Sequence, residues 1–190
     1  MTLAKIKNIV LAVAALFIAI SAYGQPSDSL QTATATNLDY ADSFVYFVDS
    51  GASPTNICAN AYVFAGPTLI SCCSCLLTPN GLTSQSVIND LLAAPNSSVS
   101  IKVLSSTPAI TNPKCDPTTP TIGTLSTGLR SWIVTFDTPS PSGGTEKVFQ
   151  LSMPSASDLN STAGVCKTAQ THGAHSFTNS QGCLCYQTVT

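Results

Sequence analysis

The residues with the greatest capacity for chemistry are the cysteines and histidines near the end of the chain. Cys166, His172, His175, Cys183 and Cys185 lie within twenty residues of one another. Thiolate sulfur and imidazole nitrogen are ligands that zinc and copper accept in proteins, although this spacing matches no standard zinc finger. One hypothesis is therefore an extracytoplasmic metal-binding or redox site that uses His172, His175, Cys183 and Cys185.

The cysteines also have a simpler interpretation as disulfide partners. An even number of cysteines in an exported chain is typical of a disulfide framework, because thiols in an oxidising compartment form bridges. Eight cysteines allow roughly a hundred pairings, so their spacing alone does not give the connectivity. On this interpretation we expect no cofactor. The disulfide candidates are Cys58, Cys72, Cys73, Cys75, Cys115, Cys166, Cys183 and Cys185.

Catalytic signatures are missing from the sequence. The chain has two histidines and nine acidic residues, enough in number for an acid–base pair. It contains no nucleophile elbow, paired-carboxylate spacing, zincin helix or phosphate-binding loop. We therefore predict that the protein is not an enzyme.

The first 24 residues are predicted to be a secretory signal peptide. Lys5 and Lys7 form a basic start, an apolar run follows over 8–20, and Ala22-Tyr23-Gly24 is a small-x-small cleavage site. The apolar run is shorter than the roughly 20 residues that a spanning helix needs. The sequence thus predicts a secreted or periplasmic protein with no membrane span after cleavage.

The charge of the remaining chain excludes one class of partner. Cleavage would remove two of the seven basic residues and none of the nine acidic ones, which leaves a formal charge of −4 with no basic cluster. Nucleic-acid binding therefore has no electrostatic support. The length suits a single domain, predicted over 39–190 after a flexible lead-in over 25–38.

A hairpin at the centre of the sequence positions half of the cysteines. A β-rich run over Ile57–Phe64 is followed by the turn signal Gly66-Pro67 and a second apolar run. A turn centred there sets Phe64 opposite Leu69 and Cys58 opposite Cys75, unless a bulge shifts the register. We therefore expect a Cys58–Cys75 bridge.

The period of a β-strand assigns the other cysteines of this segment to faces. Cys73 and Cys75 should share one face of their strand, while Cys72 points to the other. Cys183 and Cys185 share a face for the same reason if they lie on a strand. This favours bridges from the C-terminal segment to the hairpin or to Cys166. We expect that segment to secure Cys72, Cys73 and Cys115.

Other periodic segments predict a mainly β fold. We expect a disulfide-stabilised sandwich or partly open barrel with one or two short helices. The expected elements are a strand over 44–48, a short helix capped by Thr83 or Ser84 that carries Val87, Ile88, Leu91 and Leu92, a strand over 99–104, a hairpin joining 132–136 to 147–151, a helix from Ser155 and Asp158 to Gly173, and a final strand over 182–190.

Several short motifs occur together along the chain. They are Ile57-Cys58, Tyr62-Val63-Phe64, 72–82, Ser86-Val87, Asn89-Asp90-Leu91, 128–132, Cys166 and 182–185. Together they resemble a group of exported, cysteine-rich bacterial proteins, over most of the chain after the leader. The resemblance implies no activity. Similar proteins often end with Cys-x-x-Cys, whereas this chain ends with Cys-x-Cys.

The function that remains is a secreted, non-catalytic structural, adhesive or binding module. Its expected partner classes are a cell surface, a protein or a glycan. Aromatic side chains such as Tyr62 or Trp132 would form a platform for a sugar or peptide if they are exposed on a β face. Large rings are more often part of the core, so their exposure decides this question.

Overall fold

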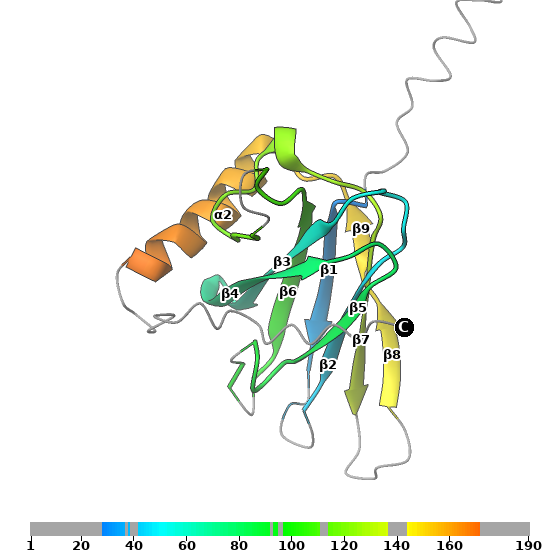
Figure 1. The fold of residues 1–190 in the computed structure, drawn as a ribbon. Coiled ribbons are helices and arrows are strands. Elements are labelled where there is room, and N and C mark those ends of the chain that lie inside the picture. The colour runs from blue at the N-terminus through cyan, green and yellow to red at the C-terminus, as the bar shows by residue number, and fades with distance from the viewer. Residues whose placement is uncertain are drawn as a thin grey trace, which may run out of the picture.

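The computed structural model describes residues 28–36, 38, 42–91, 93–94, 97–110, 114–136 and 144–171. Within these ranges, two antiparallel sheets pack against each other, and one helix lies outside them (Figure 1). This confirms the predicted mainly β fold in its sandwich form, because the two sheets remain separate and do not close into a barrel. The predicted signal peptide and the predicted strand over 182–190 lie outside the described residues.

Nine strands, one 3₁₀ turn and one helix follow one another along the described part of the chain. They are β1 Leu30–Ala35, β2 Phe44–Asp49, β3 Ile57–Ala65, β4 Thr68–Leu77, β5 Leu82–Ser86, β6 Val99–Ser106, the 3₁₀ turn η1 Ile122–Thr124, β7 Leu129–Phe136, β8 Gly144–Val148, β9 Gln150–Ser152 and α2 Ala156–Thr171. No helix in the described ranges is long and apolar enough to cross a membrane.

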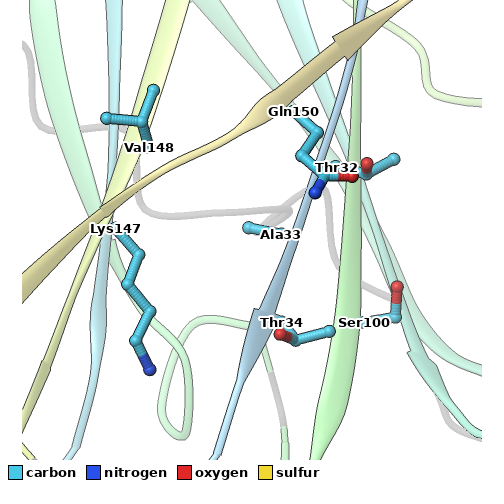
Figure 2. A pocket seen from close by; sticks show the side chains of 7 residues that line it. All are labelled: Thr32, Ala33, Thr34, Ser100, Lys147, Val148 and Gln150. Atoms are coloured by element: carbon cyan, nitrogen blue, oxygen red, sulfur yellow. The ribbon is translucent and has the colours of Figure 1, made fainter.

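The strands divide into a five-stranded and a four-stranded sheet. Sheet A has the order β4-β3-β6-β1-β9, and sheet B has the order β5-β2-β7-β8. The chain passes directly from β8 in sheet B to β9 in sheet A (Figure 2). The predicted second strand of the β7 hairpin is therefore split at Phe149, whose side chain is only 3% exposed and anchors the crossing in the core.

The main core lies between the two sheets. Alternate residues of each strand point inward, as the two-residue period requires. The inward residues of β3 include two alanines opposite cysteines of β4, Ala59 opposite Cys75 and Ala61 opposite Cys73. Small side chains at these positions leave space for sulfur atoms inside the sandwich.

Helix α2 covers the outer face of sheet A. It contributes Leu159 and Cys166 to a second buried cluster with Tyr62, Cys72 and Leu104 from the sheet. The predicted capping box starts the helix, and this prediction is confirmed. The Ser155 backbone N–H donates to Asp158 Oδ2 over 3.1 Å, and the Asp158 N–H donates to Ser155 Oγ over 3.1 Å.

The prediction of a flexible lead-in over 25–38 is wrong for residues 30–35. These residues form β1, which pairs with β6 along its length and with β9 at its start. The segment has the sequence Leu-Gln-Thr-Ala-Thr-Ala, and its inward residues are Gln31, Ala33 and Ala35. Because the inward side chains are one amide and two alanines, the segment lacks the alternation of large apolar and polar residues that usually identifies a strand.

The predicted helix after Thr83 is also wrong. Residues Leu82–Ser86 form β5, which pairs with β2, and a turn follows over 87–90. Asp42 holds that turn, because its carboxylate accepts bonds from the Ser86 hydroxyl and from the Ile88 N–H. The apolar residues 87, 88 and 91 have helical spacing, but they belong to a tight turn that buries Val87 and Leu91.

Candidate binding surface

The central hairpin has the predicted turn but not the predicted register throughout. Phe64 pairs with Leu69 across Gly66-Pro67, as expected. An irregularity between Val63 and Phe64 then shifts the pairing by one residue, so that Cys58 lies opposite Leu76. The one-residue shift turns Cys58 and Cys75 to opposite faces of the sheet, because the side chains of a strand alternate.

The described bridges accordingly differ from the predicted hairpin bridge. Cys58 bonds to Cys115 with a Cα–Cα distance of 5.5 Å, and Cys72 bonds to Cys166 with a Cα–Cα distance of 6.0 Å. The predicted Cys58–Cys75 bridge is wrong, and so is the placement of Cys115 against the C-terminal segment. The prediction that Cys72 is secured by that segment is confirmed, since Cys166 lies on α2.

Cys73 and Cys75 share one face of β4, as the strand period predicted, and this face is the interior of the sandwich. They are 6% and 0% exposed and belong to the main core, whereas Cys72 belongs to the cluster under α2. Both are disulfide-bonded, and none of the described cysteines is free. The two described bridges thus tie the loop after β6 and helix α2 to sheet A.

The predicted metal ligands are not placed by the structure. His172, His175, Cys183 and Cys185 lie outside the described residues, so the metal hypothesis stays a prediction. Within the described part of the chain, no group of three or more His, Cys, Asp or Glu side chains is arranged to hold a metal ion.

Tyr62 belongs to the core and is excluded as a binding platform. Its side chain is 0% exposed, and its hydroxyl donates to the Pro117 carbonyl over 2.6 Å. Burial, and to a lesser extent the nearby carboxylate of Asp116, raise the pKa of Tyr62 above its ordinary value. The ring therefore ties the loop after β6 to the outer face of sheet A.

Trp132 has a different environment, on the outer face of sheet B. It lies directly opposite Tyr46 on the neighbouring strand, with ring centroids 5.1 Å apart and planes within 3° of parallel. This spacing is close to the roughly 4.8 Å between strands, so the two rings stand side by side on the sheet. On the next strands, Ser84 of β5 lies opposite Tyr46 and Val148 of β8 lies opposite Trp132.

The stacked pair is part of a wider apolar surface. Residues of the same parity on β2, β7 and β8 point to the same side as Trp132. They are half-buried or exposed, with Phe44 at 36% and Val148 at 76% exposed. Arg130 at the start of β7 and Glu146 on the edge strand β8 lie on the same side. We call the apolar part of this surface the aromatic face, and it consists of Phe44, Tyr46, Val48, Trp132, Val134, Phe136 and Val148.

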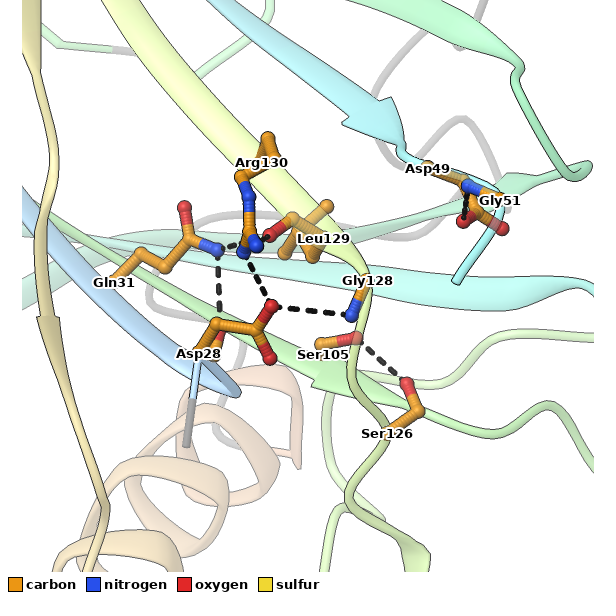
Figure 3. Close-up of polar contacts among 9 residues, drawn as sticks. All are labelled: Asp28, Gln31, Asp49, Gly51, Ser105, Ser126, Gly128, Leu129 and Arg130. Carbon is orange, nitrogen blue, oxygen red and sulfur yellow. Dashed lines mark hydrogen bonds and ion pairs between the residues drawn. The ribbon is translucent and has the colours of Figure 1, made fainter. Parts of the chain in front are cut away.

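A fixed ion pair lies at one end of the aromatic face. Arg130, two residues before Trp132, pairs with Asp28, and Asp28 Oδ2 also accepts the Gly128 N–H over 3.2 Å (Figure 3). Gln31 Nε2 donates to the Asp28 carbonyl over 3.0 Å and to the Leu129 carbonyl over 2.7 Å. These bonds join the segment before β1 to the start of β7 and neutralise the charge at that end.

Asp49 lies on the interior side of sheet B, near the same end. Its side chain is fully buried, and its Oδ1 accepts the Gly51 N–H over 2.9 Å. Burial raises the pKa of Asp49, and the bond from Gly51 opposes this only in part. Gly128 adopts φ of +99°, and a Cβ there would lie 3.4 Å from Asp49 Oδ1, so a residue without a side chain suits this position.

No protein-family model, curated protein or solved structure matches this chain. The role of the aromatic face must therefore be inferred from the geometry of the face itself. Trp132 was a candidate from the sequence, whereas Tyr46, Phe44 and Val148 were missed. The run over 44–48 is continuously apolar, so its sequence does not distinguish the side chains of the buried face from those of the outer face.

Proposed function

We propose that the protein is a secreted, non-catalytic binding module and that the aromatic face of sheet B is its contact surface. The observation that carries this proposal is the position of Phe44, Tyr46 and Trp132 on a sheet face that α2 does not cover. The helix packs on sheet A, on the opposite side of the sandwich (Figure 1).

The energetic argument concerns apolar surface that remains in contact with water. Burying apolar side chains contributes about 25 cal/mol per Å², and the core of this sandwich already uses the inward residues of both sheets. A sheet face that had only to be solvated would carry polar side chains. Alternating apolar and aromatic residues on the outer side of β2 and β7 therefore favour a surface that contacts a partner.

The size of the face limits the kind of contact. Three strands about 4.8 Å apart, with about five residues rising about 3.4 Å each, span roughly 250 Å². The largest apolar patch of a typical monomer is of the same order, about 300–600 Å², and is often functional. Each partner in a standard protein interface buries about 800 Å², so this face fits a narrow ligand such as one polymer chain or peptide segment.

The single tryptophan provides a direct test, because Trp132 is the only one in the sequence. Its emission should be accessible to acrylamide in the free protein. It should move to shorter wavelength and become less quenched when a bound ligand covers the face. A panel of soluble polysaccharides and peptides can be screened in this way.

Substitutions then locate the contact. Phe44→Ala should weaken binding of any ligand that protects Trp132. Val165→Ala is a matched control, since Val165 is 42% exposed on α2 at the other side of the molecule. A Trp132 that quencher does not reach in the free protein would contradict the proposal. So would a ligand that binds the Phe44→Ala and wild-type proteins equally.

A further inference from the structure

A small hollow lies where the chain crosses from sheet B to sheet A. Strand β9 pairs with β1 only as far as Thr32, opposite Gln150, whereas β1 continues to Ala35. Beyond Thr32, β8 diverges toward sheet B and leaves a fork between β8 and β1. The hollow in this fork has a volume of about 250 Å³ and is open on one side. We call it the fork pocket.

Both strands contribute side chains to the fork pocket. Figure 2 shows Ala33 pointing from β1 toward β8, with Lys147 of β8 extending along the opposite side of the gap. Val148 and Gln150 line it from the crossing strand, and Thr34 lines it from β1. The lining thus combines two apolar side chains with hydroxyl, amide and ammonium groups.

The polar groups of the fork pocket are not used by the fold. Within the described residues, the side chains of Thr32, Thr34, Ser100, Lys147 and Gln150 form no hydrogen bond or ion pair with one another or with their surroundings. By their register, Thr32, Thr34, Ser100 and Gln150 share the outer face of sheet A, whereas Lys147 approaches from the interior side. These groups border the hollow from two sides of the β1 edge, and their donors and acceptors remain for solvent or a ligand.

Lys147 is the most informative of these side chains. It lies opposite the buried Ile133, so it points to the interior side of sheet B, while Glu146 points to the aromatic face. An inward lysine on an edge strand discourages pairing with other chains. That role needs only a charge at the edge. It does not require three hydroxyl groups and an amide around the same hollow.

The side chains that line the fork pocket indicate which kind of ligand it can bind. One lysine matches one negative charge, and the described lining contains neither an arginine fork nor a helix N-terminus of the kind that commonly binds phosphate. Hydroxyl and amide groups can both donate and accept bonds with sugar hydroxyls, and Ala33 and Val148 suit the C–H faces of a ring. The volume lies below the roughly 300–1,000 Å³ of sites for drug-sized ligands, which indicates a single ring.

We propose that the fork pocket binds one residue of a sugar acid at the β1 edge, with the carboxylate at Lys147 on the interior side and ring hydroxyls at Thr34 and Gln150 on the outer side. The site lies at the edge of the sandwich and does not depend on the aromatic face. Its open side admits either a free uronic acid or one residue within an acidic polysaccharide.

Amide chemical shifts of the oxidised, isotope-labelled protein test this site with three probes. D-Galacturonate carries both features of the ligand, D-galactose only the hydroxyls and acetate only the carboxylate. Saturable shifts at Ala33, Thr34 and Val148 are expected with galacturonate. Galactose should bind at least tenfold more weakly, because it lacks the carboxylate and a charge-assisted hydrogen bond contributes more than this factor. Acetate should also bind at least tenfold more weakly, because it lacks the ring and the hydrogen bonds of its hydroxyls, about 0.5–1.5 kcal/mol each.

Variants separate the lysine from the rest of the pocket. Lys147→Met should weaken galacturonate binding about tenfold or more, and Lys147→Arg should retain most of it. Lys167→Met, on the exposed side of α2, is the matched control and should bind as the wild type does. Thr34→Val provides a second test if Lys147→Met disturbs the amide spectrum, and it should weaken binding several-fold.

Three results would overturn the proposal. The first is the absence of saturable shifts at the fork with galacturonate. The second is equal affinity for acetate or galactose, which would remove the sugar acid as the ligand. The third is galacturonate binding that neither Lys147→Met nor Thr34→Val weakens. Tryptophan emission, measured in the same titration, reports the aromatic face separately and distinguishes failure of this site from failure of the binding-module proposal.

Discussion

Replacing both Cys72 and Cys166 by alanine is expected to release α2 from sheet A while the sheets stay folded. Few other side chains hold the helix. Of its residues from 156 to 168, only Leu159, Thr162, Ala163 and Cys166 are buried. The rest are exposed serine, threonine, asparagine and glycine among others, which have modest helix propensity. An isolated helix of this length and composition is marginal in water.

The size of the effect can be worked from the chain length that the bridge closes. Cys72 and Cys166 are 94 residues apart, for which the chain-entropy estimate is about 4.7 kcal/mol. We expect Cys73 to be secured by the C-terminal segment, and a bond to Cys183 would be a second connection that closes most of that loop. The Cys72–Cys166 bridge then closes a loop of about 20 residues, for which the chain-entropy estimate of its stabilisation is about 3.3 kcal/mol. A loss of that size corresponds to a more than hundredfold increase in local opening.

Hydrogen exchange of the α2 amides measures this opening directly. Exchange in α2 should accelerate about a hundredfold in the Cys72→Ala, Cys166→Ala protein, with much smaller changes in β3 and β6. The matched control removes the Cys58–Cys115 bridge, which spans 57 residues and has a similar estimate of about 4.2 kcal/mol. That control should loosen the loop after β6 and leave exchange in α2 nearly unchanged.

Two results would refute this reasoning. Unchanged exchange in α2 would show that Leu159 and Ala163 hold the helix without the bridge. Equal acceleration of α2 in both double variants would show that the bridges act on global stability alone. Native-state exchange separates these cases because local and global openings give different protection patterns.

Four further predictions test other parts of the structure. Asn60→Ala should destabilise the fold by about 3 kcal/mol in urea unfolding, because the Leu104 carbonyl and the Ser106 hydroxyl lose the buried amide that bonds to them; an effect below about 1 kcal/mol would contradict this network. Because burial raises the pKa of Asp49 above its ordinary 3.8, its contribution to stability should be complete below that pH and should be lost as the pH rises through the folded-state value. The Asp49→Asn protein should lack this pH dependence in urea unfolding, and identical pH profiles would exclude Asp49 as its source. Ser155→Ala should weaken α2 by about 1 kcal/mol, seen as faster exchange in its first turns, whereas Ser157→Ala should have little effect. Peptide mapping without reduction should find Cys58 linked to Cys115 and Cys72 to Cys166, with Cys73 and Cys75 linked to Cys183 and Cys185; a Cys58–Cys75 link would contradict the structure.

The strands that the sequence predicts correctly are those with local and unambiguous signals. Ile57–Phe64 and 99–104 carry alternating or β-branched side chains, and Gly66-Pro67 marks the turn between the strands of the central hairpin. The helix after Ser155 follows from its capping box. Each of these signals lies within the element that it predicts, so no tertiary contact was needed to recognise it.

The failures depend on interactions between distant residues. β1 is a strand because β6 and β9 pair with it, and its own side chains give little indication of this. The turn after β5 depends on Asp42, which lies 44 residues before Ser86. The Cys58–Cys75 prediction failed on a single irregular residue pair at Val63 and Phe64, which has no distinctive local sequence.

The aromatic face was predicted only in part for a related reason. The sequence identifies Trp132 as part of a strand, but it does not show which face of the sheet is covered. That distinction depends on where α2 packs, and the helix is fixed to sheet A by Cys72, which points away from sheet B. The bridge therefore determines which sheet face α2 covers.

The arrangement of cysteines on β4 also has a consequence for biosynthesis. As the chain is synthesised, Cys58, Cys72, Cys73 and Cys75 appear first, and the partners of Cys58 and Cys72 follow much later, at Cys115 and Cys166. Any bridge formed among the first four would include Cys58 or Cys72 in a non-native pair, or would join Cys73 to Cys75. Such bridges must be reopened by thiol exchange before the native pairs form. Oxidative refolding of the reduced protein should therefore be faster with a disulfide isomerase or a thiol redox buffer than with an oxidant alone.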